Sequence, residues 1–161
     1  MVRNFFYFII AALLFSCKPD EVTPPPTPVE TARIVVNPSF GSLPLMLDSI
    51  YQGPNGIQIK VSDIKFYTTL LSNQNNTFAE VGYFDFREKG NVMIEQSTDY
   101  AKFSTLSFIL GVDTSLNHND PSAFPNNSPL NIMNAGSMHW GWNTGYIFIS
   151  IEGKADTLAD G

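Results

Sequence analysis

The feature that most restricts the fold is the period of the apolar residues, which alternate with polar or small residues in short runs. The clearest runs cover residues 57–61 and 106–112, and turn-forming residues separate such runs, as at residues 52–56 and 72–77. Alternation is the period of a half-buried strand, and no segment after the first 16 residues keeps a helical period. Short strands with frequent turns are typical of an antiparallel sandwich. The sequence therefore predicts an all-β fold, an antiparallel β-sandwich that is immunoglobulin-like in general architecture.

Strands are expected within this sandwich over residues 32–37, 57–61, 78–86, 92–94 and 106–112, and residues 67–71 extend the second of these or start the next. In the last of these, Leu106, Phe108 and Leu110 alternate with Ser107, Ile109 and Gly111. They are expected to be buried together as the inner face of a core strand.

The second strand contains a change of phase. Ile64 and Phe66 are out of register with the apolar side chain of Val61. One extra residue at Ser62–Asp63 produces such a slip, which predicts a β-bulge or bend at this point.

Residues 136–146 hold both tryptophans, one of the two histidines and one of the five methionines, interleaved with small residues. The β-branched and aromatic run that follows, 147–151, is expected to be a strand. Thioether and imidazole groups bind copper, and a neutral imidazole also suits zinc, so Met138 and His139 make this segment a candidate metal site. The structural alternative is that the tryptophans anchor the core while the glycines let the backbone approach closely.

The geometry of an extended chain restricts this metal hypothesis. Alternate side chains of a strand share a face, so residues 138, 140 and 142 lie together and His139 points to the other side. One ion can contact His139 and Trp140 only if Gly136 or Gly141 bends the backbone. Otherwise the imidazole has to come from elsewhere, such as His118.

Three segments resemble those of a known family. Residues 138–146, MHWGWNTGY, resemble the M-x-W-x-W-x-[ST]-G-Y segment of the MbnP-like copper-binding lipoproteins. Residues 108–113, FILGVD, followed by Asn117, resemble the family's F-x-x-G-V-D…N segment, and residues 63–67, DIKFY, resemble its strand ending in L-K-F-Y. The resemblance runs in the right order from about residue 32 to the end.

This resemblance implies a copper site in which one tryptophan is oxidised to kynurenine and binds the metal together with histidine. Opening the indole leaves an aromatic amine and a ketone, and a di-haem peroxidase-like partner performs the oxidation. The candidates are Trp140 or Trp142, with His139 and Met138. The family continues beyond Gly161, so the chain is expected to be an incomplete, C-terminally truncated member that lacks part of the sheet and some ligands.

The start of the chain resembles a bacterial lipoprotein. Residues 1–16 combine Arg3 with an apolar run, the layout of a signal peptide, and the run is too short to span a membrane. It ends at Cys17, the only cysteine, which is the expected lipidation site. Residues 17–31 form a proline-rich tether, and residues 32–161 form the sandwich domain. The charged residues after Cys17 resemble the surface-export signal of Bacteroidetes lipoproteins, so an outer-membrane lipoprotein is expected, on the periplasmic or the cell-surface face.

The charge of the chain excludes some partners. The net charge is −6, and removing residues 1–16 takes away one of nine basic residues, which leaves eight basic and fifteen acidic residues, or −7. An acidic domain has no electrostatic footprint for nucleic acid, and anionic lipid repels it, so membrane contact is expected through the lipid. No catalytic motif such as G-x-S-x-G or H-E-x-x-H occurs, and the protein is not expected to be an enzyme.

The polar segment 113–130 suggests a second candidate site. Asp113, Ser115, Asn117 and Asn119 place oxygens on alternate residues, as at the start of a calcium loop. The glycine and the final glutamate of an EF-hand are missing. Asp113 and Asn117 are therefore either part of a structural calcium site or, as we favour, residues that cap turns through the backbone.

Two functions remain open from the sequence. The first is a lipid-anchored copper-binding protein. The second is a binding module for glycan or protein, in which Trp140, Trp142 and Tyr146 form a flat platform or lie in the core. Exposure separates these hypotheses, because a glycan platform needs flat exposed rings and a metal site needs rings that converge with an imidazole.

Overall fold

The computed structural model describes residues 30–99, 102–141 and 143–156, so Cys17 and most of the expected tether lie outside it. Most of its elements are strands: β1 (Thr31–Val35), β2 (Ser39–Phe40), β3 (Leu43–Pro44), β4 (Ile50–Gln52), β5 (Gln58–Ser72), β6 (Thr77–Asp85), β7 (Val92–Ser97), β8 (Ser107–Leu110), β9 (His139–Gly141), β10 (Gly145–Tyr146) and β11 (Ile149–Asp156). The helical elements are short: η1 (Pro54–Gly56), α1 (Phe86–Lys89), α2 (Thr114–Asn117), η3 (Pro121–Ala123), α3 (Ile132–Ala135) and η4 (Gly136–Met138). Within these ranges, no helix has the length and apolar character needed to cross a bilayer. The antiparallel strands confirm the predicted all-β sandwich.

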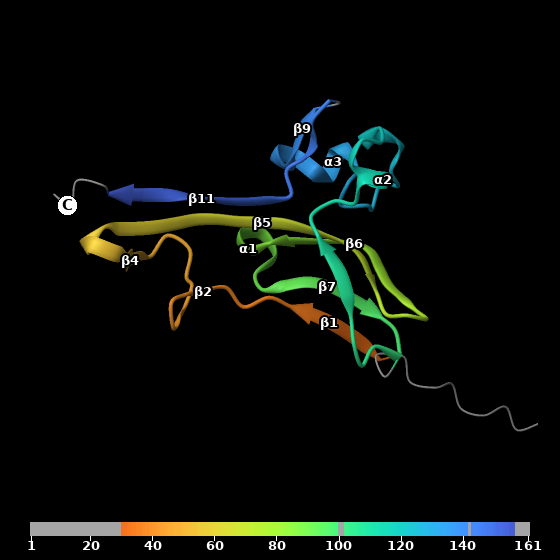
Figure 1. The fold of residues 1–161 in the computed structure, drawn as a ribbon, viewed down its shortest axis with the longest axis horizontal. Coiled ribbons are helices and arrows are strands. Elements are labelled where there is room, and N and C mark those ends of the chain that lie inside the picture. Colours follow the sequence, from red (N-terminus) through yellow and green to blue (C-terminus); the bar gives the residue numbers. More distant parts are fainter. Residues whose placement is uncertain (1–29, 100–101, 142, 157–161) are drawn as a thin grey trace, which may run out of the picture.

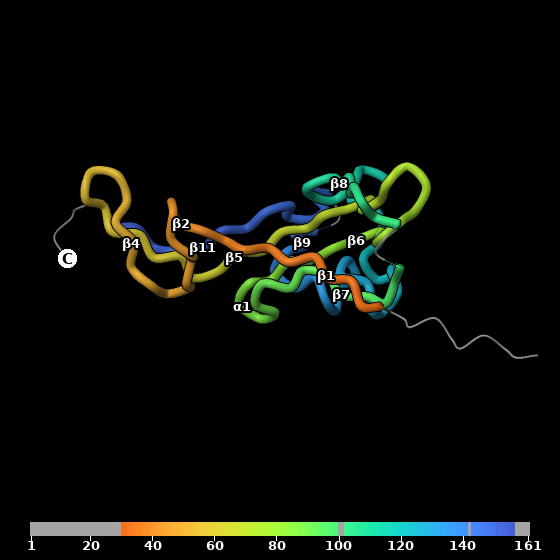
Figure 2. Tube along the Cα trace, turned by 90° about the horizontal axis from the view of Figure 1, so that it is seen from below, coloured from red at the N-terminus to blue at the C-terminus, as the bar shows by residue number. Residues whose placement is uncertain are grey.

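The larger sheet is built around β5, which spans 15 residues and pairs with four other strands. β4 and β6 lie along one edge of β5, and β11 and β8 lie along the other, all antiparallel to it. Figure 1 shows β1 and β7 on one side of β5, and β9, α2 and α3 on the opposite side. Figure 2 follows the same path from below. Residues 67–71 therefore extend the second strand and do not start another.

The predicted bulge is present in β5. Glu152 of β11 pairs with Asp63, whereas the next residue, Gly153, pairs with Val61. Ser62 is thus the extra residue on the β5 side of this ladder. A bulge inserts one residue and shifts the alternation by one, which accounts for the phase slip seen in the sequence and confirms that prediction.

The inner face of the larger sheet packs against the sheet formed by β1 and β7. The buried residues of this core are Ala32, Leu71, Phe78, Phe84 and Met93. Phe84 is fully buried, and its ring centroid lies 4.9 Å from that of Phe66 and 5.8 Å from that of Phe86. Aromatic pairs at such distances add to the stabilisation from burial. These contacts hold the two layers together.

The predicted burial of residues 106–110 is wrong for two of its three side chains. Leu106 packs against the inner core, but Phe108 is 53% exposed and Leu110 is 54% exposed. The alternation itself is correct, because Leu110 lies opposite Thr68, whose hydroxyl contacts the Met93 sulfur of β7. In the described part of the chain, the facing layer consists of β1 and β7 and is too narrow to cover β8. The alternation of apolar residues therefore predicted which face of β8 points inward, but not how much of that face the other layer covers.

Candidate metal site at the β9–β10 hairpin

Residues 111–148, here called the cap, leave the sheet after β8 and return to it before β11. Both ends of the cap are bound by the backbone of Tyr67, whose carbonyl accepts from the Gly111 N–H at 2.8 Å and whose N–H donates to the Phe148 carbonyl at 3.0 Å. The cap covers the outer face of β5 and β6. It forms a second core with that face, whose buried residues are Tyr67, Tyr83, Val112, Leu130, Ala135, Met138 and Tyr146.

Three tyrosines hold the cap on the sheet. The rings of Tyr67 and Tyr83 stack with centroids 4.8 Å apart, and Tyr146 meets Tyr67 edge to face at 5.7 Å. The Tyr146 hydroxyl donates to the Leu130 carbonyl. Burial raises the pKa of Tyr67 and of Tyr83 well above the usual tyrosine value, and it raises the pKa of Tyr146 to about 12. The three phenols therefore remain neutral at physiological pH and act as structural anchors for the hairpin.

The backbone of the tryptophan-rich segment is irregular. Gly136 has a φ of 50° after α3, and Gly141 has a φ of 132° at the end of β9. Positive φ values are accessible to glycine at little steric cost. A turn then closes the hairpin, with the Thr144 N–H donating to the Gly141 carbonyl at 3.2 Å. The bend that the metal hypothesis requires at Gly136 or Gly141 is thus present at both.

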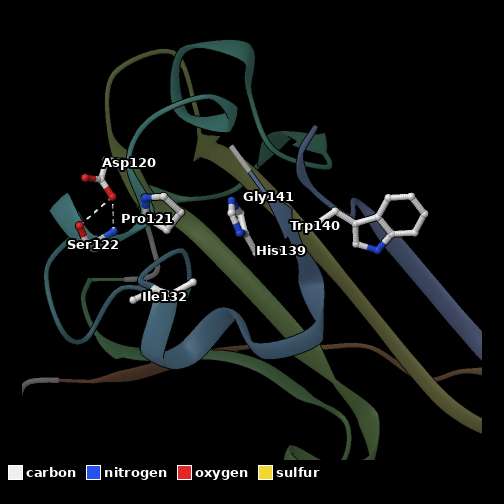
Figure 3. Close-up of a pocket in the computed structure, with 7 residues that line it drawn as sticks. All are labelled: Asp120, Pro121, Ser122, Ile132, His139, Trp140 and Gly141. Atoms are coloured by element: carbon white, nitrogen blue, oxygen red, sulfur yellow. Dashed lines mark hydrogen bonds between the residues drawn. The ribbon is translucent and has the colours of Figure 1, made fainter. Parts of the chain in front are cut away.

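The predicted sharing of a face by residues 138 and 140 is wrong. Met138 ends the turn η4 and is 1% exposed in the cap core, whereas Trp140 is 73% exposed. The extended backbone starts only at His139, so strand alternation does not apply to Met138. Trp142 lies outside the described residues. Figure 3 shows the Trp140 indole and the His139 imidazole projecting to different sides of β9.

His139 and Trp140 are the candidate site residues that line a pocket. His139 is half-buried, lies opposite Tyr146 in the hairpin and meets the Tyr146 ring at 4.9 Å. The pocket has a volume of about 210 Å³ and is lined by Asp120, Pro121, Ser122, Ile132, His139, Trp140 and Gly141. In Figure 3, Pro121 lies between Asp120 and His139, and the Asp120 carboxylate is turned toward Ser122. The pocket lining thus contains one imidazole and one acidic residue.

These donors do not complete a copper site. The Asp120 carboxylate already accepts from the Ser122 N–H at 2.8 Å and from the Ser122 hydroxyl at 2.7 Å. Met138 is not among the residues that line the pocket, and its thioether lies in the apolar core. In the described ranges, no three His, Cys, Asp or Glu side chains gather closely enough to hold a metal ion. The His139 imidazole is therefore a nitrogen ligand of the kind that copper binds, but the pocket residues around it do not complete the set of ligands that the ion needs.

Asp113 and Asn117 bind the backbone, which favours the capping interpretation over a calcium site. The Asp113 carboxylate caps α2 by accepting from the Ser115 N–H at 2.9 Å and the Ser115 hydroxyl at 2.6 Å, and these bonds lower its pKa. The buried Asn117 side chain accepts from the Tyr146 N–H at 2.9 Å. Asn117 thereby ties α2 to the hairpin that carries His139. The exposed His118 follows it and is absent from the pocket lining.

The sequence did not indicate that Asp120 and His139 line the same pocket. The residues are separated by 18 positions of polar, proline-bearing chain, and only the folding of the cap brings η3 against β9. Asp120-Pro121-Ser122 does carry a local signal, because Asp before Pro is a common start of a turn. That signal predicts that the Asp120 side chain begins the turn η3, but it does not predict where η3 lies in the fold.

A comparison with protein families assigns the chain. The family described as MbnP matches residues 29–160, which include the whole cap and the hairpin. No curated protein and no solved structure matches the chain. The match covers most of the sequence, and it agrees with the order of the three segments that resemble this family. The chain therefore belongs to the MbnP family.

Proposed function

We propose that this protein is a lipid-anchored, extracytoplasmic copper-binding protein whose metal site is built at the β9–β10 hairpin. The observation that carries the proposal is the family match across residues 29–160, because the MbnP family is linked to copper binding. The matched range includes the segment from Met138 to Tyr146. It also includes His139, which lines the pocket at the hairpin.

His139 is the proposed nitrogen ligand. Packing against Tyr146 restricts its ring, and a restricted ligand loses little freedom when it binds a metal. Since Asp120 and His139 are only two donors, further ligands are needed from outside this pair. A kynurenine formed from Trp140 or Trp142 supplies an aromatic amine and a ketone. The 73% exposure of Trp140 supports this, because an exposed indole is accessible to a peroxidase-like partner.

Copper titration of the full chain tests the site. We expect His139→Ala to weaken copper binding by more than about tenfold, since even residues behind a metal ligand contribute 10–100-fold. His118→Ala is the matched control and is expected to bind copper as the wild type does, because His118 is exposed and does not line the pocket. Loss of copper in the His118 variant alone would place the site elsewhere.

Intact-mass measurement after treatment with a di-haem peroxidase-like partner tests the modification. The mass change of a tryptophan-to-kynurenine conversion is expected in the wild type and should disappear in either Trp140→Phe or Trp142→Phe. The variant that lacks the change identifies the oxidised residue. Unmodified tryptophans, together with no copper retained in any form, would contradict the proposed function.

The exposure of Trp140 also favours a second candidate, a module that binds glycan through aromatic stacking. Met133, on the neighbouring helix α3, is 84% exposed, and Ile132 is 47% exposed. This candidate predicts glycan binding that Trp140→Ala abolishes and that His139→Ala leaves unchanged. The copper proposal predicts instead that His139→Ala reduces metal retention.

The membrane anchor rests on Cys17 at the end of the apolar leader. Cys17→Ser is expected to move nearly all of the protein from the membrane fraction to the soluble fraction, because acyl chains supply the membrane affinity. Cell fractionation with immunoblotting measures the distribution, and a Ser16→Ala variant that keeps the cysteine serves as the control. If the Cys17 variant stays with the membrane, the anchor proposal is wrong.

A further inference from the structure

A row of three tyrosine rings runs from the β9–β10 hairpin into the larger sheet. The His139 imidazole meets the Tyr146 ring of β10, with 4.9 Å between the ring centroids. Tyr146 meets Tyr67 of β5 at 5.7 Å, and Tyr67 stacks on Tyr83 of β6 at 4.8 Å. All three tyrosines are buried. Since neighbouring rings are in contact, an electron can pass along this row in short steps.

The hydrogen-bond partners of the three hydroxyl groups differ. Tyr146 and Tyr67 both donate to backbone carbonyls of the cap, and a peptide carbonyl is too weak a base to take a proton from a phenol. The Tyr83 hydroxyl donates instead to Oδ2 of Asp85 at 3.4 Å, and Asp85 is also buried. A carboxylate can take the phenol proton. Within this row, Tyr83 is therefore the tyrosine that has a proton acceptor.

The charges around Tyr83 couple the loss of an electron to the loss of a proton. Burial and the Asp85 carboxylate raise the pKa of Tyr83 well above the usual tyrosine value, so the phenol is protonated. The Lys89 ammonium lies 5.1 Å from the centroid of the Tyr83 ring. A ring that lost only an electron would be positive and would be repelled by this ammonium. Transfer of the proton to Asp85 leaves the oxidised ring neutral and avoids that repulsion.

We propose that Tyr83 and Asp85 together store one oxidising equivalent that enters the protein at the hairpin. A one-electron oxidant at the hairpin takes an electron from Tyr146, and electrons from Tyr67 and then Tyr83 refill the row. The Tyr83 O–H bond breaks, its proton moves to the Asp85 carboxylate and its electron leaves through the row. The products are a neutral tyrosyl radical on Tyr83, a protonated Asp85 and the oxidant reduced by one electron.

The position of Tyr83 separates the radical from the surface where the oxidant acts. Trp140 of the hairpin is 73% exposed, so a radical formed there meets solvent. Tyr83 is 8% exposed and lies beneath the cap, in the core that the cap forms with the sheet. We therefore expect a radical on Tyr83 to outlive one on the hairpin. This redox role does not require copper and is independent of the proposed function.

A photo-oxidant attached to the hairpin tests the relay. Cys17 is the only cysteine, so the full chain with Cys17→Ser and Thr144→Cys has a single thiol, at an exposed position of the hairpin. A ruthenium polypyridyl label on this thiol becomes a one-electron oxidant after a laser flash with a sacrificial electron acceptor. Freeze-quench electron paramagnetic resonance of the chelator-treated, copper-free protein then detects the radical. We expect a persistent tyrosyl signal.

Two nearly isosteric variants of the labelled protein identify the site of the radical. Tyr83→Phe keeps the ring but removes the phenol, and it is expected to lose most of the persistent signal. Asp85→Asn cannot take the proton and is expected to show the same loss. Its amide oxygen can still accept the Glu88 N–H that the Asp85 carboxylate binds at 3.0 Å, so the cap of α1 is retained.

Further variants of the labelled protein test the route. Tyr146→Phe interrupts the row at its entry and is expected to lower the yield of the Tyr83 radical. Tyr51→Phe is the matched control, because it removes a buried phenol from a different core, and it should leave the signal unchanged. Moving the label to Ser39→Cys, an exposed position on β2, should give no signal that depends on Tyr83.

Circular dichroism confirms that the compared variants share the fold of the labelled protein. The absence of a tyrosyl radical in the labelled protein would overturn the proposal. A signal that survives undiminished in Tyr83→Phe or in Asp85→Asn would overturn it as well. A Tyr83 radical that forms equally well from the label on β2 would contradict entry at the hairpin.

Discussion

Replacing Phe84 with alanine is expected to lower the free energy of unfolding by about 3–5 kcal/mol, the range for a core phenylalanine. The side chain is fully buried between Phe66 and Phe86. Its removal leaves a cavity between the two layers and also removes two aromatic contacts. Chemical denaturation followed by far-ultraviolet circular dichroism measures the loss.

Phe108→Ala is the matched control, because it deletes the same side chain from the same face of the same sheet. Phe108 is 53% exposed on β8, so less apolar area returns to water when it is removed. The expected cost is about 1 kcal/mol. Equal losses in the two variants would show that β8 is covered as fully as β6, contrary to the arrangement described here.

Replacing Gly145 with alanine is expected to lower the free energy of unfolding by about 2–5 kcal/mol, from backbone strain and overpacking together. Gly145 has a φ of 75°, and a Cβ there would lie 2.5 Å from the Asn117 side-chain oxygen and 2.6 Å from the Asn117 backbone oxygen. The methyl group would therefore push the hairpin away from α2. Denaturation measures the global loss, and hydrogen exchange of residues 139–146 is expected to show faster opening of the hairpin.

Gly56→Ala separates strain from packing. Gly56 has a φ of 77°, nearly that of Gly145, but no atom lies within 4 Å of the position of its Cβ. Only the cost of backbone strain is then expected, which lowers the free energy of unfolding by about 1–2 kcal/mol. If both variants lose the same stability, the added methyl group at residue 145 is accommodated beside Asn117 without cost, contrary to this prediction.

The positions of the longer strands along the chain and the bulge at Ser62 could be predicted, because both depend on local periodicity that the sequence shows directly. The exposure of Phe108 could not, because it depends on how far the β1–β7 layer extends over β8. Periodicity tells which side of a strand is apolar but does not tell how wide the facing layer is.

The candidate site was only partly predictable for a related reason. The segment from Met138 to Tyr146 marks the hairpin, and the glycines indicate its bends. The turn η4 separates the environments of Met138 and Trp140, and a turn of three residues has no period to detect. Asp120 reaches the pocket through the tertiary packing of the cap, which no local pattern encodes.

The binding of both ends of the cap by Tyr67 has a consequence for how this fold can diversify. Since the cap leaves and rejoins the sheet at one residue, the scaffold fixes its closure whatever lies between the two ends. Doubling the length of a closed flexible loop costs only about 0.6 kcal/mol in entropy. The sandwich and the cap can therefore change separately. Ligand residues can be exchanged or loops inserted between Gly111 and Phe148 while the strand pairing of β5 is preserved.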